Sequence, residues 1–302
     1  MMSFKIKEEI RCAGGKLLKV MHQSKATGTP MDVNLYLPQQ YYDGTSKAEI
    51  PSLYFLSGLT CTPNNASEKA FWQREADKYG FAMVFPDTSP RGPEVPTDPE
   101  GGWDFGVGAG FYVNATQPPF NVNFNMYQYV HSELPNALTE FFGSEDRPTG
   151  LGSIDFTENV SITGHSMGGF GAVSGFLKNV NKYKSCSAFA PIIDPTTTPW
   201  GVKAFTGYLG ADKKTWKEYD PCELINEVPY VPGKEILIHY GTNDQWKEPY
   251  LRPEHFMKLV PQSKWANHID VQLVDGFDHS YYFISTFVPE HAEFHAKHLG
   301  LI

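Results

Sequence analysis

A serine inside a glycine-rich segment is the residue whose surroundings point most clearly to chemistry. The segment reads Gly164-His165-Ser166-Met167-Gly168, a G-x-S-x-G pattern that occurs once in the chain. A serine hydroxyl attacks a carbonyl carbon only when it is held exposed beside a base. A sharp strand-to-helix turn can hold it so, and glycines two residues before and after the serine leave room for that turn. The pattern predicts Ser166 as a nucleophile for acyl transfer, with a plain glycine-rich turn as the alternative.

An acid and a histidine follow the serine in the order that such a turn requires. Asp244 comes soon after the apolar run 236–240, and His279 comes after the run 271–274. His279 is predicted to take the hydroxyl proton and later return one to the leaving group. Asp244 is predicted to fix the tautomer of the imidazole and to stabilise its charged form.

Three other residues compete for these two roles. Asp278 adjoins His279, and adjacency in sequence points its side chain elsewhere. Asp87 ends an earlier strand and is expected to shape a loop. His165 lies inside the sharp turn itself, where its backbone is more useful than its ring as a base.

Two backbone N–H groups are predicted to form an oxyanion hole, which stabilises the negative charge that develops on the substrate oxygen. One is the amide of Met167, directly after the nucleophile. The other is the amide of Leu59, in the segment Ser57 to Thr62 that follows an early strand. Gly58 would let that backbone approach the serine closely. An ordinary β-turn is the alternative for this segment.

Apolar patterns along the chain predict the elements that must position these residues. Strands are expected at 16–24, 31–37, 51–56, 81–86, 159–163, 187–190, 236–240 and 269–274. Helices are expected at 67–79, with Asn65 as its cap and Gly80 as its stop, and at 126–142, 169–179, 253–260 and 281–298. Apolar strands that alternate with helices predict an α/β fold whose mostly parallel central sheet carries helices on both faces.

The 302 residues contain no internal repeat and no low-complexity linker, so one domain spanning 1–302 is expected. Two long segments interrupt the alternation of strands and helices, at about 87–125 and 191–232. Long stretches without regular structure in a compact domain are usually functional. These excursions are expected to form the walls of a pocket.

Composition excludes several classes of protein. With 41% apolar and 20% charged residues the chain is globular, and a net charge of −9 without a Lys/Arg cluster argues against nucleic-acid binding. The N-terminus lacks the apolar core of a signal peptide, and no apolar run reaches the roughly 18 residues of a membrane-spanning helix. Four widely spaced cysteines indicate reduced thiols rather than disulfides or a zinc module. A cytoplasmic protein that binds neither membranes nor nucleic acid is expected.

Several separate motifs together resemble those of one known family. They are Ser57 to Thr62, Trp103 to Tyr112, Gly164 to Gly169, Pro199 to Phe205 and Asp278 to Tyr282. These segments are similar to the S-formylglutathione hydrolase (esterase D) family, and the likeness runs from about Gly14 to the C-terminus. Around 191–199, members often have more cysteine than this chain.

The resemblance implies an α/β-hydrolase fold and hydrolysis of a small thioester, S-formylglutathione, to formate and glutathione in formaldehyde detoxification. It implies a triad of Ser166, Asp244 and His279, with Leu59 and Met167 as oxyanion donors. It further implies no metal or organic cofactor, a cytoplasmic location and a possible homodimer. A broad short-chain carboxylesterase, an acyltransferase and a non-catalytic protein that kept the fold are the alternatives.

A narrow pocket would suit the unhindered formyl carbon of such a substrate. Its walls are predicted from four aromatic residues, for each of which core packing is the competing role: Trp103, Phe105, Phe111 and Trp200. Lys203 or Arg91 could meet a glutathione carboxylate, against a solvated position on the surface. Cys61, two residues from Leu59, is predicted to be thiol-sensitive without being catalytic.

Two further patterns are discounted. The run Gly106 to Gly110 lacks the glycine spacing and the flanking strand and helix of a dinucleotide site. His291, His295 and His298 share one helix face, where they are expected to point to solvent. No metal site is therefore predicted.

Overall fold

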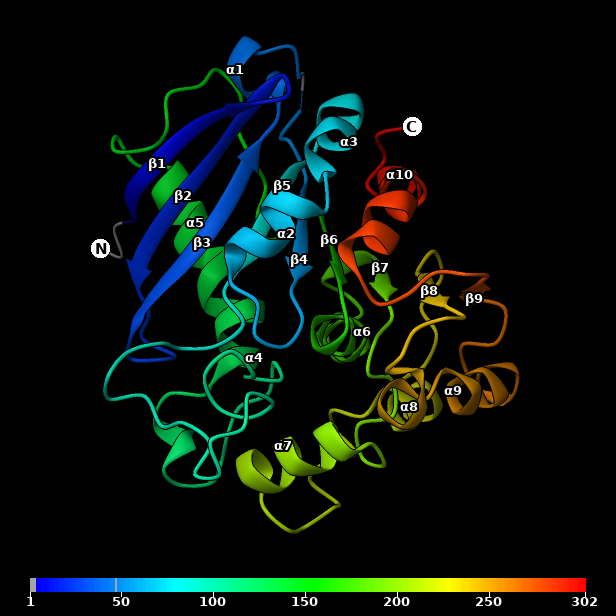
Figure 1. Cartoon of the computed structure of the whole chain (residues 1–302). Coiled ribbons are helices and arrows are strands. Elements are labelled where there is room, and N and C mark those ends of the chain that lie inside the picture. The colour runs from blue at the N-terminus through cyan, green and yellow to red at the C-terminus, as the bar shows by residue number, and fades with distance from the viewer. Residues whose placement is uncertain (1–3, 47) are drawn as a thin grey trace.

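A nine-stranded sheet forms the centre of the molecule in the computed structural model, which describes residues 4–46 and 48–302 (Figure 1). The strand order is β1-β2-β3-β5-β4-β6-β7-β8-β9. The first three strands and β5 pair antiparallel, and every pairing from β5 to β9 is parallel. The strands are β1 (Lys5–Cys12), β2 (Gly15–Gln23), β3 (Pro30–Leu37), β4 (Ser52–Leu56), β5 (Ala82–Pro86), β6 (Val160–Gly164), β7 (Tyr183–Phe189), β8 (Ile236–Gly241) and β9 (Ile269–Val274).

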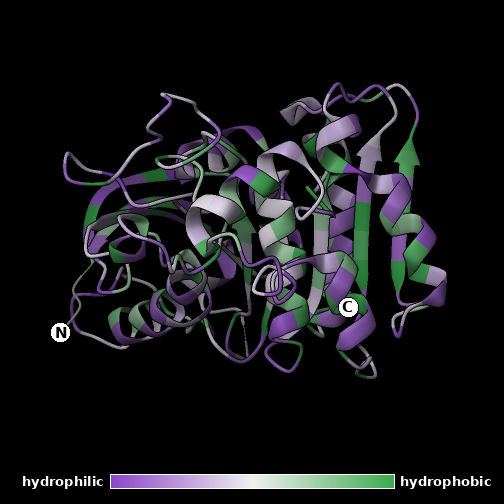
Figure 2. Ribbon diagram, turned by 90° about the horizontal axis from the view of Figure 1, so that it is seen from below, coloured by the Kyte–Doolittle hydropathy of each residue, from purple (hydrophilic) through white to green (hydrophobic). Residues whose placement is uncertain are grey.

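Burial on both faces explains why the central strands read as short apolar runs. Every residue of β4, β5, β6 and β8 is buried. A parallel sheet needs crossover helices, which cover it on both sides, so its strands lose the alternation of an exposed sheet. Figure 2 shows long green, hydrophobic stretches in strands of the sheet, while the helices carry both colours.

Helices form one layer on each face of the sheet (Figure 1). One layer consists of α2 (Pro63–Lys69), α3 (Trp72–Tyr79) and α10 (Tyr281–His298). The other contains α5 (Leu134–Phe142) and α6 (Met167–Lys178), with α8 (Pro221–Glu227) packed on α6. The remaining helical segments are α1 (Gln39–Asp43), η1 (Phe120–Val122), α4 (Met126–Gln128), η2 (Tyr129–Glu133), α7 (Pro199–Leu209), η3 (Lys247–Leu251), α9 (Pro253–Leu259) and η4 (Val260–Gln262). Of these, α7 and α9 lie with α8 beyond the carboxyl ends of the parallel strands.

The predicted α/β fold class is confirmed, with differences at particular elements. Strand β1 was not expected because its charged sequence has no apolar alternation, and it lies exposed at the edge of the sheet. The expected helix 67–79 is two helices, because Phe71 between them adopts a left-handed φ of 61°. The first of these begins at Pro63, so Asn65 is not its cap; its Oδ1 instead accepts the N–H of Thr62 at 2.9 Å.

Segment 191–232 also differs, because it contains the helices α7 and α8. Glycines inside α7 lower its helix propensity, which hides the helix in the sequence. They are needed for close packing. A Cβ on Gly201 would lie 2.1 Å from the Pro195 carbonyl oxygen, and one on Gly207 would lie 2.2 Å from the Phe105 ring. Segment 87–125 has only the short η1 as a helix.

Two of the three α10 histidines do not point to solvent, contrary to expectation. His291 and His295 are fully buried against the sheet. His295 bonds Ser185 and Ser187 of β7, both at 2.8 Å, and His291 Nε2 lies 2.7 Å from Nδ1 of His239. Burial holds the pKa of His291 and that of His295 well below the ordinary value. Both rings therefore serve as neutral polar links inside the core.

His131 of η2 is a buried, neutral histidine that lowers the free energy of unfolding in acid. Its Nδ1 lies 2.7 Å from the Tyr183 hydroxyl, and burial lowers its pKa from 6.5 to about 3, helped by Lys182 and Lys178. Below pH 6.5 the unfolded chain takes up a proton on this residue that the folded chain refuses. The free energy of unfolding therefore falls as the pH drops, by about 2 kcal/mol at pH 5.

We expect His131→Gln to reduce this acid sensitivity. The loss of unfolding free energy between pH 7 and pH 5, measured by urea titration, should be smaller in the variant than in the parent by about 2 kcal/mol. The comparison of two pH values within each protein removes the cost of the substitution itself. An equal loss in both proteins would contradict the prediction.

Candidate active site

Ser166 stands at a strained turn between β6 and α6. Its backbone has φ 57° and ψ −118°, a conformation that costs a non-glycine residue free energy and is typical of functional sites. Its amide donates to the Phe189 carbonyl oxygen at 2.9 Å, and its own carbonyl oxygen accepts the amide of Ile192 at 3.2 Å. Helix α6 starts at the next residue, two positions earlier than predicted, so its N-terminal end faces the serine.

The glycines around the serine are required by the crowding of this turn. A Cβ on Gly164 would lie 2.2 Å from the Gly168 carbonyl oxygen. A Cβ on Gly168 would lie 2.0 Å from the carbonyl oxygen of Leu56, at the end of β4. Real Cβ atoms cannot approach so closely, so both positions exclude every other residue type.

His279 and Asp244 come together from two neighbouring loops. His279 Nδ1 lies 2.6 Å from Asp244 Oδ2, and the amide of Trp246 donates to Asp244 Oδ1 at 2.8 Å. The aspartate side chain is fully buried, and that of His279 is 12% exposed. A buried carboxylate that bonds Nδ1 leaves Nε2 of the ring as the nitrogen available for proton transfer.

Neither competing acid reaches His279. Asp278 Oδ1 accepts the amide and the hydroxyl of Ser280, at 3.0 and 2.6 Å, in front of α10. Asp87 is paired with the Arg91 guanidinium at 2.9 and 3.0 Å. The geometry therefore favours Asp244 as the partner of the imidazole.

The two amides expected at an oxyanion hole are free of acceptors in the described part of the chain, since neither Leu59 nor Met167 donates its N–H to another residue. Gly58 gives the close approach that the first of them needs, because a Cβ there would lie 3.2 Å from that of Ser166. The loop is fixed further along by the Thr60 amide, which donates to the Gly108 carbonyl oxygen at 2.8 Å.

A cavity of about 210 Å³ opens above the serine. It is lined by Gly58, Leu59, Cys61, Trp103, His165, Ser166, Trp200, Trp246 and His279. The three tryptophans pack on one another, with ring centroids 5.5 Å apart for Trp103 and Trp200 and 5.0 Å apart for Trp200 and Trp246. Trp246 was missed at the sequence level, although it stands two residues after Asp244.

Three of the residues predicted for the pocket lie elsewhere. Phe105 is buried against Phe120 and Tyr208, and Phe111 is buried against Phe170. Both are core residues, because each ring has its aromatic neighbours inside the fold. Lys203 is held by two carboxylates, Asp98 at 2.7 Å and Asp104 at 2.5 Å, and is not among the residues that line the cavity.

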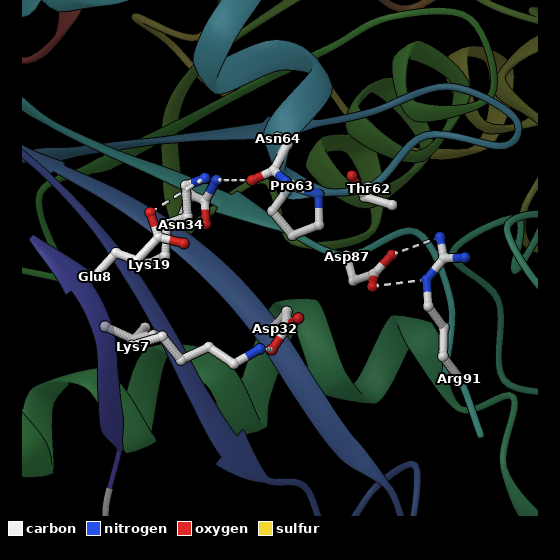
Figure 3. A pocket seen from close by; sticks show the side chains of 11 residues that line it. Lys7, Glu8, Lys19, Asp32, Asn34, Thr62, Pro63, Asn64, Asp87 and Arg91 are labelled. Carbon is white, nitrogen blue, oxygen red and sulfur yellow. Dashed lines mark hydrogen bonds and ion pairs between the residues drawn. The ribbon is translucent and has the colours of Figure 1, made fainter. Parts of the chain in front are cut away.

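Arg91 lies in a second hollow of about 220 Å³, between β1, β2, β3 and the start of α2 (Figure 3). Besides its pair with Asp87, its Nη2 donates to the Cys61 carbonyl oxygen at 2.9 Å. Figure 3 shows the other charges of this hollow paired in the same way, such as Lys7 with Asp32 at 2.7 Å. Arg91 therefore supports the loop of the oxyanion hole from behind instead of lining the cavity.

The His165 ring takes a part in the site that was expected only of its backbone. Its centroid lies 4.4 Å from that of His279, and neither ring nitrogen has a partner in the described residues. Burial, together with the nearby His279, holds its pKa well below the ordinary value. A neutral ring there packs beside the His279 imidazole and is less able than that imidazole to accept a proton.

The comparisons with known proteins identify the family of the chain. The family model "Esterase", described as "Putative esterase", matches residues 24–294. The chain is 56% identical over 302 residues to the S-formylglutathione hydrolase of Saccharomyces cerevisiae, covering 99% of this chain and 100% of that protein. The enzyme of the same name from Rattus norvegicus is 42% identical over 291 residues, 96% of each chain.

A solved structure extends the likeness to the fold. The S-formylglutathione hydrolase from Agrobacterium tumefaciens superposes with a TM-score of 0.86 at 38% identity, covering 98% of this chain and 100% of that one. In the described part of the chain, no helix is both long enough and apolar enough to span a bilayer.

Replacement of Asp244 should distinguish its role from that of Asp278. We expect Asp244→Asn to lower kcat by about 10⁴-fold, because an amide favours the wrong tautomer of His279. Asp278→Asn is the matched control, and its kcat should stay within about tenfold of the parent. The measurement is hydrolysis of a short-chain aryl acetate, and a larger loss in the control would overturn the assignment.

Cys61 should react slowly with alkylating reagents, and faster as the pH rises. Its Sγ lies 3.9 Å from the Tyr281 hydroxyl, and burial raises the pKa of the thiol above 9.0. Because the thiolate is the nucleophile, the inactivation rate with iodoacetamide should rise by about tenfold per pH unit between pH 7 and 9.

The Cys61→Ala variant should hydrolyse ester while resisting the reagent. A folded but inactive variant would mean that the thiol takes part in the chemistry.

Proposed function

The chain belongs to the esterase family, among the S-formylglutathione hydrolases, and from that premise we propose that Ser166, His279 and Asp244 hydrolyse S-formylglutathione to formate and glutathione. The observation that carries the proposal is the arrangement of these three residues. Ser166 and His279 line one cavity, and His279 is bonded through Nδ1 to the buried Asp244.

The reaction proceeds in two halves. His279 takes the hydroxyl proton as Ser166 Oγ attacks the formyl carbon, and the amides of Leu59 and Met167 donate to the developing oxyanion. The C–S bond then breaks, and His279 gives its proton to the departing sulfur, which leaves as glutathione. A water molecule, deprotonated by the same imidazole, attacks the formyl-serine; formate leaves and the serine hydroxyl is restored.

The cavity limits the acyl group. Its volume of about 210 Å³ is below the range of about 300–1,000 Å³ typical of pockets that enclose a drug-sized ligand. It holds the formyl group and the thioester, while the rest of the tripeptide extends out of the cavity. The tryptophan walls narrow the space beside the reacting carbon and leave little room for longer acyl chains.

A short-chain carboxylesterase is the second candidate, because the same apolar tryptophan walls accept an acetyl ester. The ratio of kcat/KM for S-formylglutathione to that for an aryl acetate distinguishes the two activities. A ratio above one supports the thioesterase, and a ratio well below one supports the carboxylesterase.

We also propose that the chain is one catalytic unit that acts as a cytoplasmic homodimer. Support for the location comes from the four cysteines, which are all free thiols in the structure. Support for the dimer comes from the resemblance to a family whose members often form dimers.

The test is release of glutathione from S-formylglutathione by the purified protein. Ser166→Ala should lower kcat by about 10⁶-fold, because it removes the hydroxyl that forms the proposed acyl intermediate. A serine-reactive phosphonate should label the parent and leave the variant unlabelled. Equal labelling of both proteins would contradict the proposed nucleophile, and a labelled parent that releases no glutathione would contradict the proposed substrate.

A further inference from the structure

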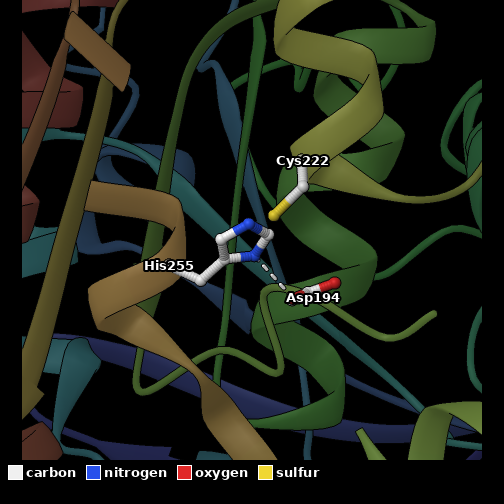
Figure 4. A group of neighbouring side chains, drawn as sticks. All are labelled: Asp194, Cys222 and His255. Atoms are coloured by element: carbon white, nitrogen blue, oxygen red, sulfur yellow. Dashed lines mark hydrogen bonds and ion pairs between the residues drawn. The ribbon is translucent and has the colours of Figure 1, made fainter. Parts of the chain in front are cut away.

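Three metal-ligating side chains meet outside the active site. Asp194, Cys222 and His255 each offer one ligand atom, and these atoms lie within 4.8 Å of one another. Figure 4 shows the three side chains turned toward a common centre, from the loop after β7, from α8 and from α9. His255 Nδ1 lies 2.6 Å from Asp194 Oδ2, and the Cys222 thiol faces the Ile193 carbonyl oxygen at 3.4 Å.

Two buried carboxylates in and beside this cluster have no lysine or arginine partner among the residues that the structure describes. Asp194 and Asp220 are both buried, and in the described residues neither forms an ion pair with a lysine or arginine. Asp220 lies beside the cluster, where its side chain accepts the amide of Cys222 at 2.8 Å and that of Thr196 at 3.1 Å. The nearby Arg252 pairs with Glu248 instead, with its Nε 3.6 Å from the Glu248 Oε1. Buried carboxylates that lack a cation in the protein favour one from solution.

The donor set selects the kind of cation. A thiolate, an imidazole and a carboxylate together suit Zn²⁺ and similar borderline ions, whereas Mg²⁺ and Ca²⁺ prefer oxygen donors alone. We propose that Asp194, Cys222 and His255 bind one divalent ion of the zinc class, with water as the remaining ligand. Water has access because the His255 side chain is 41% exposed, and this exposed side is also the path of entry.

Binding is coordination without redox change. The Cys222 thiol gives up its bond to Ile193 and loses its proton to solvent, and the thiolate donates an electron pair to the ion. His255 binds as the neutral imidazole. Because the thiol must lose its proton to bind the ion, affinity for the ion rises with pH.

The site ties together three segments that support the active site from behind. Next to Asp194, the amide of Ile192 donates to the Ser166 carbonyl oxygen at 3.2 Å, and that of Ile193 donates to Leu251 at 3.1 Å. None of the three ligands lines the cavity above Ser166. The ion therefore acts as a clamp on the fold and takes no part in the hydrolysis.

The test uses Co²⁺ as a spectroscopic substitute for Zn²⁺ on chelator-treated full-length protein. We expect one Co²⁺ per chain, with the intense near-ultraviolet absorption of a thiolate–cobalt bond. Cys222→Ser should abolish this absorption. Cys61→Ala is the matched control, because Cys61 is the thiol that lines a cavity with two histidines, and it should keep the absorption in full.

A second measurement follows stability, in case Cys222→Ser does not fold. Zn²⁺ at 100 times its Kd should raise the Tm of the parent by about 5 °C. His255→Ala, at a partly exposed position, should weaken Zn²⁺ binding by about tenfold or more and so cut this shift to about half or less at the same concentration. Absence of the absorption in the parent, its persistence in Cys222→Ser, or its loss in Cys61→Ala would overturn the proposal. In any of these cases Asp194 and His255 form an ion pair without a bound metal ion.

Discussion

Close contact between the backbone at the end of β4 and the turn after β6 is the constraint on which the site depends. Leu56 accepts the amide of His165 at 3.0 Å, and its carbonyl oxygen occupies the space where a Cβ of Gly168 would be. Because the two backbones touch, the loop that begins at Ser57 necessarily passes over the serine. One contact thus places the nucleophile and brings the Leu59 amide to its side, while α6 supplies the other amide at its first residue.

Parallel pairing at the other end of the sheet brings Asp244 and His279 together. Strands β8 and β9 are paired in register up to Gly241 and Val274, so the loops that carry Asp244 and His279 leave the sheet at one point. The two loops are also bonded to each other, since the Asn243 amide donates to the Phe277 carbonyl oxygen at 2.9 Å. The register of the two strands therefore places the His279 imidazole and the Asp244 carboxylate side by side, with Nδ1 2.6 Å from Oδ2.

These two backbone constraints explain which parts of the site could be predicted from the sequence. The nucleophile turn is local, and its glycines are visible because backbone crowding permits no other residue. Asp244 and His279 follow apolar strands, and parallel strands deliver their ends to one edge, so order along the chain was sufficient. Phe105 and Phe111 were placed in the pocket wrongly because an aromatic residue in a long loop has the same appearance whether it faces a cavity or the core. Helix α7 stayed hidden because tertiary packing of Gly201 and Gly207 outweighs helix propensity.

The tryptophan walls of the cavity and the three residues of the proposed triad come largely from different parts of the chain. Solved structures at 14–18% identity share this fold, among them ferulic acid esterases, and a shared fold does not by itself select a substrate. The cavity walls here are Trp103, Trp200 and Trp246, which come from the two long excursions and from the loop of the catalytic acid. Trp246 belongs to both functions, because its amide holds Asp244 while its ring packs on Trp200. One residue therefore joins the wall of the cavity to the carboxylate that is bonded to His279.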